Sequence, residues 1–231
     1  MKKLVIIPTY NEIENMKLLL PILMKLDSQF DILIVDDNSP DGTAAFVEKY
    51  KTENNRVNIL NRPQKQGLGK AYIAGFKWGL EKKYDVLTEM DADFSHAPEH
   101  LAQILKAIET TDVVIGSRYV PGGGTVNWSL LRKIISRGGS LYSRIILGYP
   151  INDWTGGFNS WKKEVLEKIN LDMIKSNGYS FQIELKYKAL KNNFKVLEVP
   201  IIFEDRRVGQ SKMSLKIVLE AFYKVWMIRY Y

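Results

Sequence analysis

The 231-residue sequence contains no cysteine and only two histidines. The lack of cysteine excludes disulfides, thiolate metal sites and a cysteine nucleophile, and it suits a reducing compartment. Long apolar runs are missing as well. The first run, Leu4–Ile7, ends at Pro8 and is too short for the core of a signal peptide, and no stretch reaches the about 18 residues of a membrane span. We therefore expect a globular chain without a spanning segment.

The composition is that of a globular protein large enough to form one sizeable core, with 45% hydrophobic and 26% charged residues. Lysine and arginine number 33 against 26 acidic residues, which gives a net charge of +7. Such a balance favours an anionic partner, namely a nucleotide, a lipid phosphate, a membrane surface or a nucleic acid. A solvated basic surface is the alternative. No nucleic-acid recognition motif accompanies the charge, so we expect no nucleic-acid partner.

Apolar strand-like segments alternate with amphipathic helix-like segments along the first half of the chain. The expected strands are Lys3–Ile7, Asp31–Val35, Val57–Asn61, Tyr84–Met90 and Asp112–Ser117. The expected helices are Asn15–Leu26, Thr43–Lys51, Gly69–Lys82 and Pro98–Glu109, with a kink at Pro21. This alternation predicts an α/β fold with a mostly parallel central sheet and helices on both faces. We expect the sheet to continue at Phe194–Phe203, and Pro121–Gly124 to be a mobile connection.

Two carboxylates, Asp91 and Asp93, stand where the fourth expected strand ends. In extended backbone, side chains at positions i and i+2 point the same way, so both could bind one hard cation. Such a cation could bridge to the phosphates of a substrate. An acidic surface turn has the same spacing, and the pair alone does not distinguish the two.

Other polar motifs follow the neighbouring strands, at the sheet edge where ligands bind in such folds. In the turn Asp36–Thr43, either Asp41 or Thr43 could cap the next helix, and a remaining carboxylate could bind a nucleobase or ribose. The loop Gln66–Lys70 carries two glycines but matches neither a dinucleotide fingerprint nor a P-loop. It could bring the backbone close to a ligand.

The two histidines, His96 and His100, are four residues apart, a spacing that can bind zinc on a helix. Because Pro98 places His96 before the helix and no third ligand is evident, capping or surface roles are favoured for both.

Two later segments gather cations. In the amphipathic segment Asn127–Leu147, one helical face carries an arginine and small residues that could hold a phosphate: Arg132, Ser136, Gly139, Ser140 and Ser143. An ordinary closely packed helix would have the same pattern. The stretch Phe203–Lys212 sets Arg206, Arg207 and Lys212 around Gly209, as in a flexible clamp on a pyrophosphate or in a solvated basic loop.

Taken together, the motifs resemble an inverting family 2 glycosyltransferase with a GT-A fold. They run in order through nearly the whole chain: Pro8–Glu12, Asp36–Thr43, Gly67–Gly69, Asp91–Asp93, Gly116–Tyr119, Asp153–Phe158 and Arg206–Lys212. Within that family the chain is most similar to the polyprenol-phosphate mannosyltransferases, which include the dolichol-phosphate mannose synthases.

The resemblance implies roles for individual residues. Nucleotide-sugar binding falls to Pro8, Tyr10, Glu12, Asp36, Asp91, Arg206 and Lys212. Acceptor-phosphate binding falls to Arg118, Arg132 and Ser136, metal binding to Asp91, Asp93 and Ser95, and the catalytic residues are Asp93, Arg118 and Arg206. Ser95 stands where the family often carries a glutamine ligand, and Asn159 stands where many relatives carry arginine, so Asn159 is assigned no role.

The implied reaction is transfer of mannose from GDP-mannose to a polyprenyl or dolichyl monophosphate with inversion, assisted by Mg²⁺ or Mn²⁺. The expected location is peripheral, on the cytoplasmic face of a membrane. UDP-glucose is the alternative donor. A noncatalytic module that binds a nucleotide or a lipid phosphate is the alternative from another class.

We expect a GT-A domain over residues 1–213 and an amphipathic C-terminal helix over residues 214–231. The polar residues Lys216, Glu220 and Lys224 are spaced four apart, and a broad apolar arc surrounds them. Such a helix could lie at a membrane interface or pack on the core.

Overall fold

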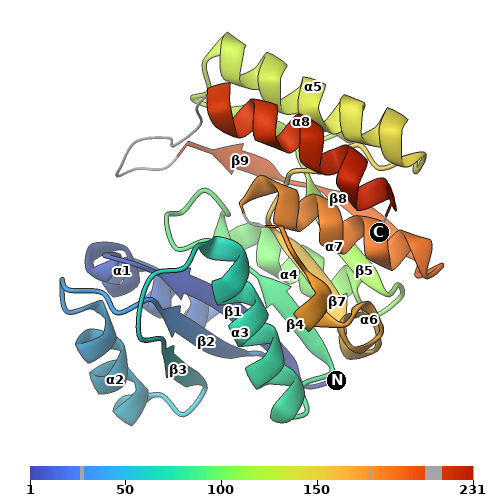
Figure 1. The fold of residues 1–231 in the computed structure, drawn as a ribbon. Helices are drawn as coiled ribbons and strands as arrows, with labels where there is room; N and C mark the ends of the chain where they lie inside the picture. Colours follow the sequence, from blue (N-terminus) through green and yellow to red (C-terminus); the bar gives the residue numbers. More distant parts are fainter. Residues whose placement is uncertain (27–28, 177, 206–214, 231) are drawn as a thin grey trace.

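The computed structural model describes residues 1–26, 29–176, 178–205 and 215–230, and it has an α/β architecture (Figure 1). Seven strands form the central sheet in the order β3-β2-β1-β4-β7-β5-β8. Their bounds are β1 Lys3–Thr9, β2 Asp31–Asp36, β3 Val57–Asn61, β4 Val86–Glu89, β5 Val113–Ser117, β7 Asn159–Lys162 and β8 Val196–Pro200. Only β7 runs antiparallel to its neighbours, so the predicted mostly parallel sheet is confirmed.

Alternation along β1 explains why the sheet has helices on both faces. Val5 and Ile7 face a core formed with α1 (Ile13–Lys25), α2 (Thr43–Glu53) and α4 (Pro98–Ala107). Leu4 and Ile6 face the opposite core, formed mainly with α3 (Leu68–Glu81), α6 (Lys163–Ile169) and α7 (Tyr179–Lys191). A short 3₁₀ helix, Leu171–Met173, joins α6 to α7. All four strand side chains are completely buried, as expected for a strand between two helical layers.

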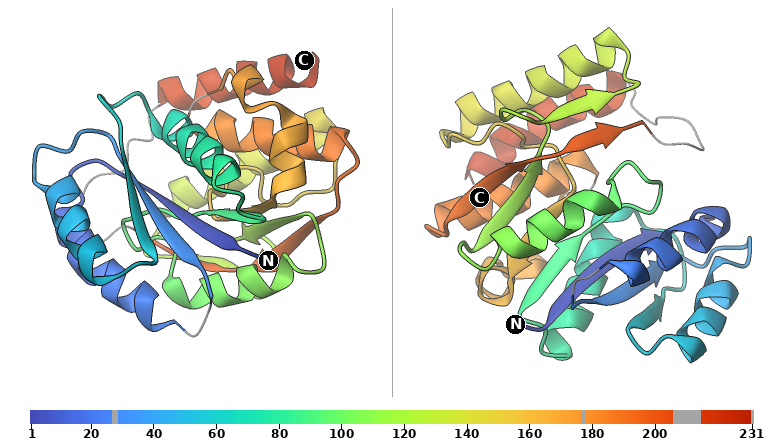
Figure 2. Two further views of the ribbon diagram at one scale, coloured as in Figure 1. Left: turned by 90° about the horizontal axis from the view of Figure 1, so that it is seen from below. Right: turned by 180° about the vertical axis from the view of Figure 1, so that it is seen from behind.

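A second sheet forms beyond the central one. It contains β6 (Gly124–Val126) and β9 (Ile202–Glu204), which pair in parallel. The expectation that one sheet continues through Phe203 is therefore wrong after Pro200, because the chain leaves β8 there and pairs with β6. Beside this small sheet, α5 (Leu130–Leu147) and α8 (Leu215–Tyr230) lie side by side (Figure 2). The Tyr142 hydroxyl donates to the backbone oxygen of Phe222 at 3.2 Å.

The segment Pro121–Gly124 forms a tight turn, and its expected mobility stays a prediction. The Gly123 N–H donates to the Val120 carbonyl at 2.9 Å, and Gly124 begins β6. A Cβ at Gly123 would lie 2.5 Å from the backbone oxygen of Ser117. The glycine is thus required by a close approach of two backbone segments.

Candidate active site

The loops at the carboxyl ends of β1, β2, β3 and β4 meet at one edge of the sheet. The strands lie side by side in the order β3-β2-β1-β4, so the polar segments that follow them become neighbours. Direct contacts connect the loops: the Asn11 N–H donates to Ser39 Oγ at 3.0 Å, and the Glu12 N–H donates to Thr43 Oγ1 at 3.1 Å. The sequence-predicted motifs are therefore brought together as expected for this fold.

Asp91 and Asp93 lie in the loop after β4. The hydroxyl of Tyr72, a buried residue of α3, donates to Asp91 Oδ1 at 2.9 Å, and the Ser95 N–H donates to Asp93 Oδ1 at 3.1 Å. Burial, and then the charge of Asp91, raise the pKa of Tyr72 well above its usual value, so the phenol remains a donor. Phe94 adopts φ 63, a left-handed conformation that is rare for a bulky residue and is found where a fold imposes a local geometry.

The residues of this loop fit a hard divalent cation. Ser95 is 2% exposed, and its Oγ has no hydrogen-bond partner among the described residues. Two carboxylates and one hydroxyl supply the oxygen ligands that Mg²⁺ and Mn²⁺ prefer. In the described part of the chain, no group of three His, Cys, Asp or Glu side chains could hold a metal. A metal at Asp91 and Asp93 would therefore complete its coordination with substrate phosphates and water.

His96 is buried, with 1% exposure, which corrects the expected capping or surface role. Its Nδ1 accepts the Asp91 N–H at 2.9 Å, and its ring stacks on Phe158 with centroids 4.7 Å apart. Burial lowers the pKa of His96, so the neutral ring can accept at Nδ1. His100 is partly buried, and its Nε2 accepts the N–H of Ile202 in β9 at 2.9 Å. The two histidines thus join the loop after β4 and helix α4 to other parts of the fold.

Asp36 and Asp41, in the turn after β2, have different hydrogen-bond partners. Asp36 is fully buried, and its carboxylate accepts from the Thr9 and Ser39 hydroxyls at 2.9 and 2.7 Å. Asp41 accepts the N–H groups of Ile13 and Thr43, at 3.1 and 3.0 Å, at the starts of α1 and α2. The expected capping by Asp41 is confirmed. Contact of Asp36 with a base or ribose stays a prediction.

The three residues expected to line the nucleotide pocket lie around the end of β1. Pro8 is the penultimate residue of that strand and is partly buried. Tyr10 is 36% exposed, and the Lys65 ammonium lies 3.7 Å from its ring centroid. Glu12 Oε2 accepts from Asn15 Nδ2 at 2.6 Å. An exposed aromatic face beside a cation suits a stacked base with phosphates nearby.

Arg118, directly after β5, belongs to a buried ionic cluster. Its Nε and one terminal nitrogen donate to the two oxygens of Asp153, both at 2.7 Å, and the same terminal nitrogen donates to Thr155 Oγ1 at 2.8 Å. Burial alone would raise the pKa of Asp153, but the Arg118 guanidinium outweighs it and lowers the value to about 2. Arg118 is therefore held in one orientation by its counterion.

Lys186 and Glu89 are two fully buried charged residues near Asp153 that the sequence does not mark. The Lys186 ammonium on α7 donates to the backbone oxygens of Asp153, Trp154 and Gly156 at 2.9, 3.2 and 2.8 Å, fixing the loop that carries Asp153. Burial lowers its pKa to about 8. Burial also raises the pKa of Glu89 to about 7, although three side chains donate to that carboxylate. No sequence signal marks either residue, since isolated charges in such segments usually face solvent.

Asn159, for which the sequence indicates no role, donates a hydrogen bond to Glu89. Its Nδ2 donates to Glu89 Oε2 at 2.8 Å, while Gln182 Nε2 donates to Oε1 at 3.0 Å.

Arg132 and Ser136, on the first turns of α5, lie close to the Arg118 loop. Arg132 pairs with Asp205 at 2.7 Å, and the Tyr119 hydroxyl donates to Ser136 Oγ at 2.7 Å. Of the remaining small residues of the predicted face, Ser140 and Ser143 are buried, so close packing accounts for them. Gly139 is not closely packed, because a Cβ at that position would meet no atom within 4 Å. Arg206, Lys212 and the rest of the predicted cationic clamp lie outside the described residues.

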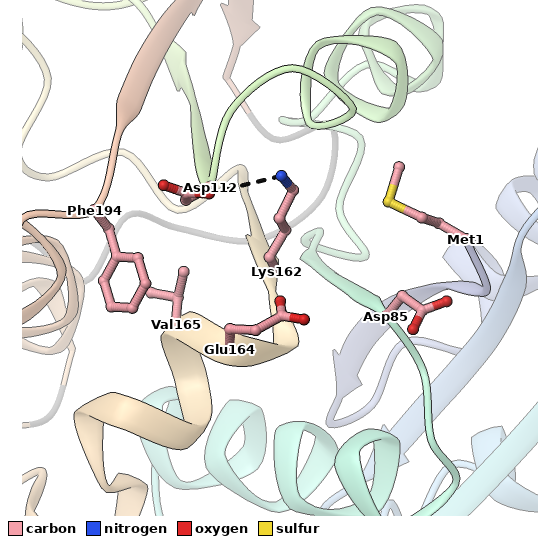
Figure 3. A pocket seen from close by; sticks show the side chains of 7 residues that line it. All are labelled: Met1, Asp85, Asp112, Lys162, Glu164, Val165 and Phe194. Carbon is pink, nitrogen blue, oxygen red and sulfur yellow. Dashed lines mark ion pairs between the residues drawn. The ribbon is translucent and has the colours of Figure 1, made fainter.

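One cavity, of about 590 Å³, lies away from these motifs (Figure 3). It opens at the amino ends of the parallel strands, near Asp85 before β4 and Asp112 before β5. Lys162 reaches from β7 toward Asp112, at 3.6 Å. Ligands of such folds bind at the opposite edge, so this cavity is not the candidate site.

Residues 4–170 match the family described as glycosyl transferase family 2. The chain belongs to this family. Two curated relatives match over almost the whole chain. The undecaprenyl-phosphate mannosyltransferase of Micrococcus luteus is 50% identical over 97% of this chain and 93% of its own length. The polyprenol monophosphomannose synthase of Mycolicibacterium smegmatis is 49% identical over 99% of this chain and 88% of its own.

Solved structures confirm the fold. Glucosyl-3-phosphoglycerate synthase from Mycobacterium tuberculosis, in complex with UDP, matches with a TM-score of 0.67 at 15% identity, over 99% of this chain and 80% of that one. A mannosyltransferase from Pyrobaculum calidifontis, in complex with GDP-Man and Mn²⁺, matches with a TM-score of 0.61 at 16% identity, over 99% and 73%. The family match and the curated relatives show that this chain is a glycosyltransferase, and the solved structures confirm the expected GT-A fold.

Proposed function

We propose that this chain transfers mannose from GDP-mannose to a polyprenyl monophosphate, with inversion at the anomeric carbon. The observation that carries the proposal is the near-50% identity to two polyprenyl-phosphate mannosyltransferases over almost the full chain. The site chemistry supports it, because one edge of the sheet combines an acidic loop at Asp91 with a cationic cluster at Arg118 and Arg132. An acidic loop suits a metal-bound nucleotide, and the cations suit a second phosphate.

In the proposed reaction, a phosphate oxygen of the lipid forms the new bond to the anomeric carbon. The bond from that carbon to the GDP oxygen breaks, and GDP leaves with the electron pair. A lipid phosphate is already an anion at neutral pH, so it needs orientation and charge screening rather than a strong general base. Arg118, fixed by Asp153, and Arg132 would supply both.

Asp91 and Asp93, with Ser95 beside them, would hold Mg²⁺ or Mn²⁺. Such an ion, when bound, stabilises the negative charge that develops on the departing nucleoside diphosphate. Tyr72 positions the Asp91 carboxylate, and the Ser95 N–H positions that of Asp93. Arg206 and Lys212 remain predicted contacts of the donor phosphates.

Asp93→Asn tests the metal site. It keeps the side-chain size and removes one anionic ligand, so we expect at least a hundredfold loss of turnover and a higher metal concentration at half-maximal activity. Asp172→Asn is the matched control, since its carboxylate is 75% exposed on the surface. Unchanged turnover and metal dependence in Asp93→Asn would exclude this site.

The donor is tested by assaying purified protein with a polyprenyl phosphate and either GDP-mannose or UDP-glucose. We expect mannosyl transfer that a chelator abolishes. Glucosyl transfer in its place would favour the alternative donor. Binding of nucleotide and lipid phosphate without any transfer would favour the noncatalytic module.

We further propose that α5 and α8 rest on the membrane that contains the acceptor. Five apolar side chains of α5 are more than half exposed: Leu130, Leu131, Ile134, Leu141 and Ile145. In α8, Val225 and Ile228 are buried while Phe222, Tyr223, Trp226 and Tyr230 are exposed, so this helix has both a core-facing and an outward side. None of the described helices is long and apolar enough to cross a bilayer.

The outward apolar side chains of α5 alternate with the exposed cations Lys133, Arg137 and Arg144, a composition that suits an anionic lipid surface. Ile134→Ser with Ile145→Ser should release the protein from anionic vesicles in a flotation assay, with Leu18→Ser on α1 as an exposed control. Equal flotation of both variants would contradict the attachment. The cytoplasmic side of the membrane stays a prediction.

A further inference from the structure

Two buried N–H donors near the cationic cluster lack an acceptor among the described residues. They are Nε1 of Trp128 and Nε of Arg132. Trp128 is only 8% exposed, and the Arg132 side chain is 13% exposed. An unpaired buried donor loses its hydrogen bond to water without gaining another, and such groups are rare unless a ligand or a solvent molecule satisfies them.

The Trp128 indole lies close to both arginines of the cationic cluster. Its ring centroid is 4.0 Å from the Arg132 guanidinium carbon and 5.4 Å from that of Arg118. Phe203 packs against the indole ring in an edge-to-face contact, with ring centroids 5.3 Å apart. The indole therefore joins two cations that belong to different segments, the β5 loop and α5.

Local structure fixes this arrangement. Trp128 directly precedes Ser129, whose Oγ accepts the Arg132 N–H and caps α5. The first turn of the helix thus sets Trp128 and Arg132 side by side. Asp153 and Asp205 are the counterions of Arg118 and Arg132, yet neither accepts from the Trp128 Nε1 or Arg132 Nε hydrogens.

We infer that the Trp128 indole N–H donates a hydrogen bond to the acceptor phosphate, together with Nε of Arg132. The inference rests on the proposed function, since it adds a binding residue to the acceptor side of that site. A single indole N–H donor would orient the phosphate oxygen that it binds, which the charge of a guanidinium alone would not do. Because its ring contacts both guanidinium groups, the indole also links the residues proposed to surround the phosphate.

The buried indole of Trp154 has different surroundings from that of Trp128. Trp154 Nε1 is likewise buried without a partner among the described residues, but the ring is fully enclosed in the hydrophobic core. No described cation lies over this ring, so its surroundings do not suit an anionic ligand.

The direct test is an indole ¹H–¹⁵N correlation spectrum of the full chain, titrated with farnesyl phosphate or with uncharged farnesol. The chain has five tryptophans, and the Trp128 signal is the one missing from Trp128→Phe. We expect this signal to move downfield with farnesyl phosphate but not with farnesol. If that variant does not fold, the other four Trp→Phe variants identify the signal by elimination.

Steady-state kinetics of a Trp128 variant is the second test. Trp128→Phe keeps an aromatic ring and removes the N–H, so we expect kcat/KM for the polyprenyl phosphate to fall roughly ten- to hundredfold, as for one lost hydrogen bond to a charged group. The KM for GDP-mannose should stay unchanged. Trp78→Phe, on α3 against Tyr84, is the matched control and should behave as wild type.

The inference is overturned if farnesyl phosphate does not bind, or if it binds without moving the Trp128 signal. It is also overturned if Trp128→Phe retains full acceptor kcat/KM. Failure of the proposed function looks different, because the wild-type chain would then not transfer mannose although the Trp128 signal responds to the phosphate.

Discussion

Replacing Asp153 by asparagine would break the buried ion pair that orients Arg118. The carboxylate accepts four hydrogen bonds: three from Arg118, including its backbone N–H at 3.0 Å, and one from the Gly156 N–H at 2.9 Å. All four partners are donors. An amide NH₂ would therefore face a donor in either orientation, and the Arg118 charge would stay buried without its counterion.

The loss in the free energy of unfolding can be calculated in two ways. Removing one partner of a buried ion pair costs about 3–5 kcal/mol. The fall in the pKa of Asp153 from 3.8 to about 2 corresponds to about 2 kcal/mol of preference for the ionised form in the folded state. We therefore expect Asp153→Asn to lower the free energy of unfolding by at least about 2 kcal/mol at neutral pH, a large part of the about 5–15 kcal/mol of a typical domain.

Urea unfolding followed by circular dichroism measures the effect. Glu14→Gln is the control, because its pair with Lys17 is exposed and should change stability by less than about 0.5 kcal/mol. Since the folded pKa of Asp153 is depressed, the stabilisation is complete above pH 3.8 and is lost as the pH falls toward 2. A loss below about 1 kcal/mol, or additive effects of Asp153→Asn and Arg118→Gln, would refute the reasoning.

Two further predictions concern stability. Gly75→Ala should lower the free energy of unfolding by about 1–3 kcal/mol, because the new Cβ would lie 2.5 Å from Ile6 Cγ2. Gly138→Ala in α5 should raise the free energy of unfolding by up to about 1 kcal/mol, because its Cβ would meet no atom within 4 Å. Thermal melts that rank the two variants the other way would contradict this prediction. Burial raises the folded pKa of Glu89 from 4.5 to about 7, so its contribution to stability is present below pH 4.5 and is lost as the pH rises through 7. The unfolding free energy of wild type relative to Glu89→Gln should therefore fall by about 2 kcal/mol between about pH 5.5 and 9, and a pH-independent difference would exclude this titration.

Local patterns were sufficient to predict the first half of the fold. Buried strands read as continuous apolar runs, and turn residues separate them from amphipathic helices, so each expected strand up to Ser117 is present within two residues at either end. The short strand β7 was not predicted. Its residues Asn159–Lys162 have no apolar run, and only its position between β4 and β5 makes it a strand.

The site was predictable where a motif determines its own geometry and unpredictable where distant segments meet. Asp91 and Asp93 follow a strand end, and Asp41 caps a helix by local spacing. Lys186 stands in a helix whose sequence does not distinguish a buried lysine from a solvated one. Only the fold, by bringing the carbonyl oxygens of the loop after Asp153 around its ammonium, turns that lysine into a support of the site.

The acidic loop and the cationic cluster at this sheet edge have to remain distinct, since arginines that paired with the carboxylates proposed to bind a metal would leave neither group for its proposed ligand. Two opposite charges 4 Å apart attract by about 4 kcal/mol at a protein surface, enough to collapse such a site. The structure counters this attraction by giving each arginine its own acid, Asp153 for Arg118 and Asp205 for Arg132. These acids hold the two cations in place through their own ion pairs, at 2.7 Å in each case. The same pairing explains why the buried acid Asp153, which no proposed substrate touches, should matter as much to the acceptor as the arginine it holds.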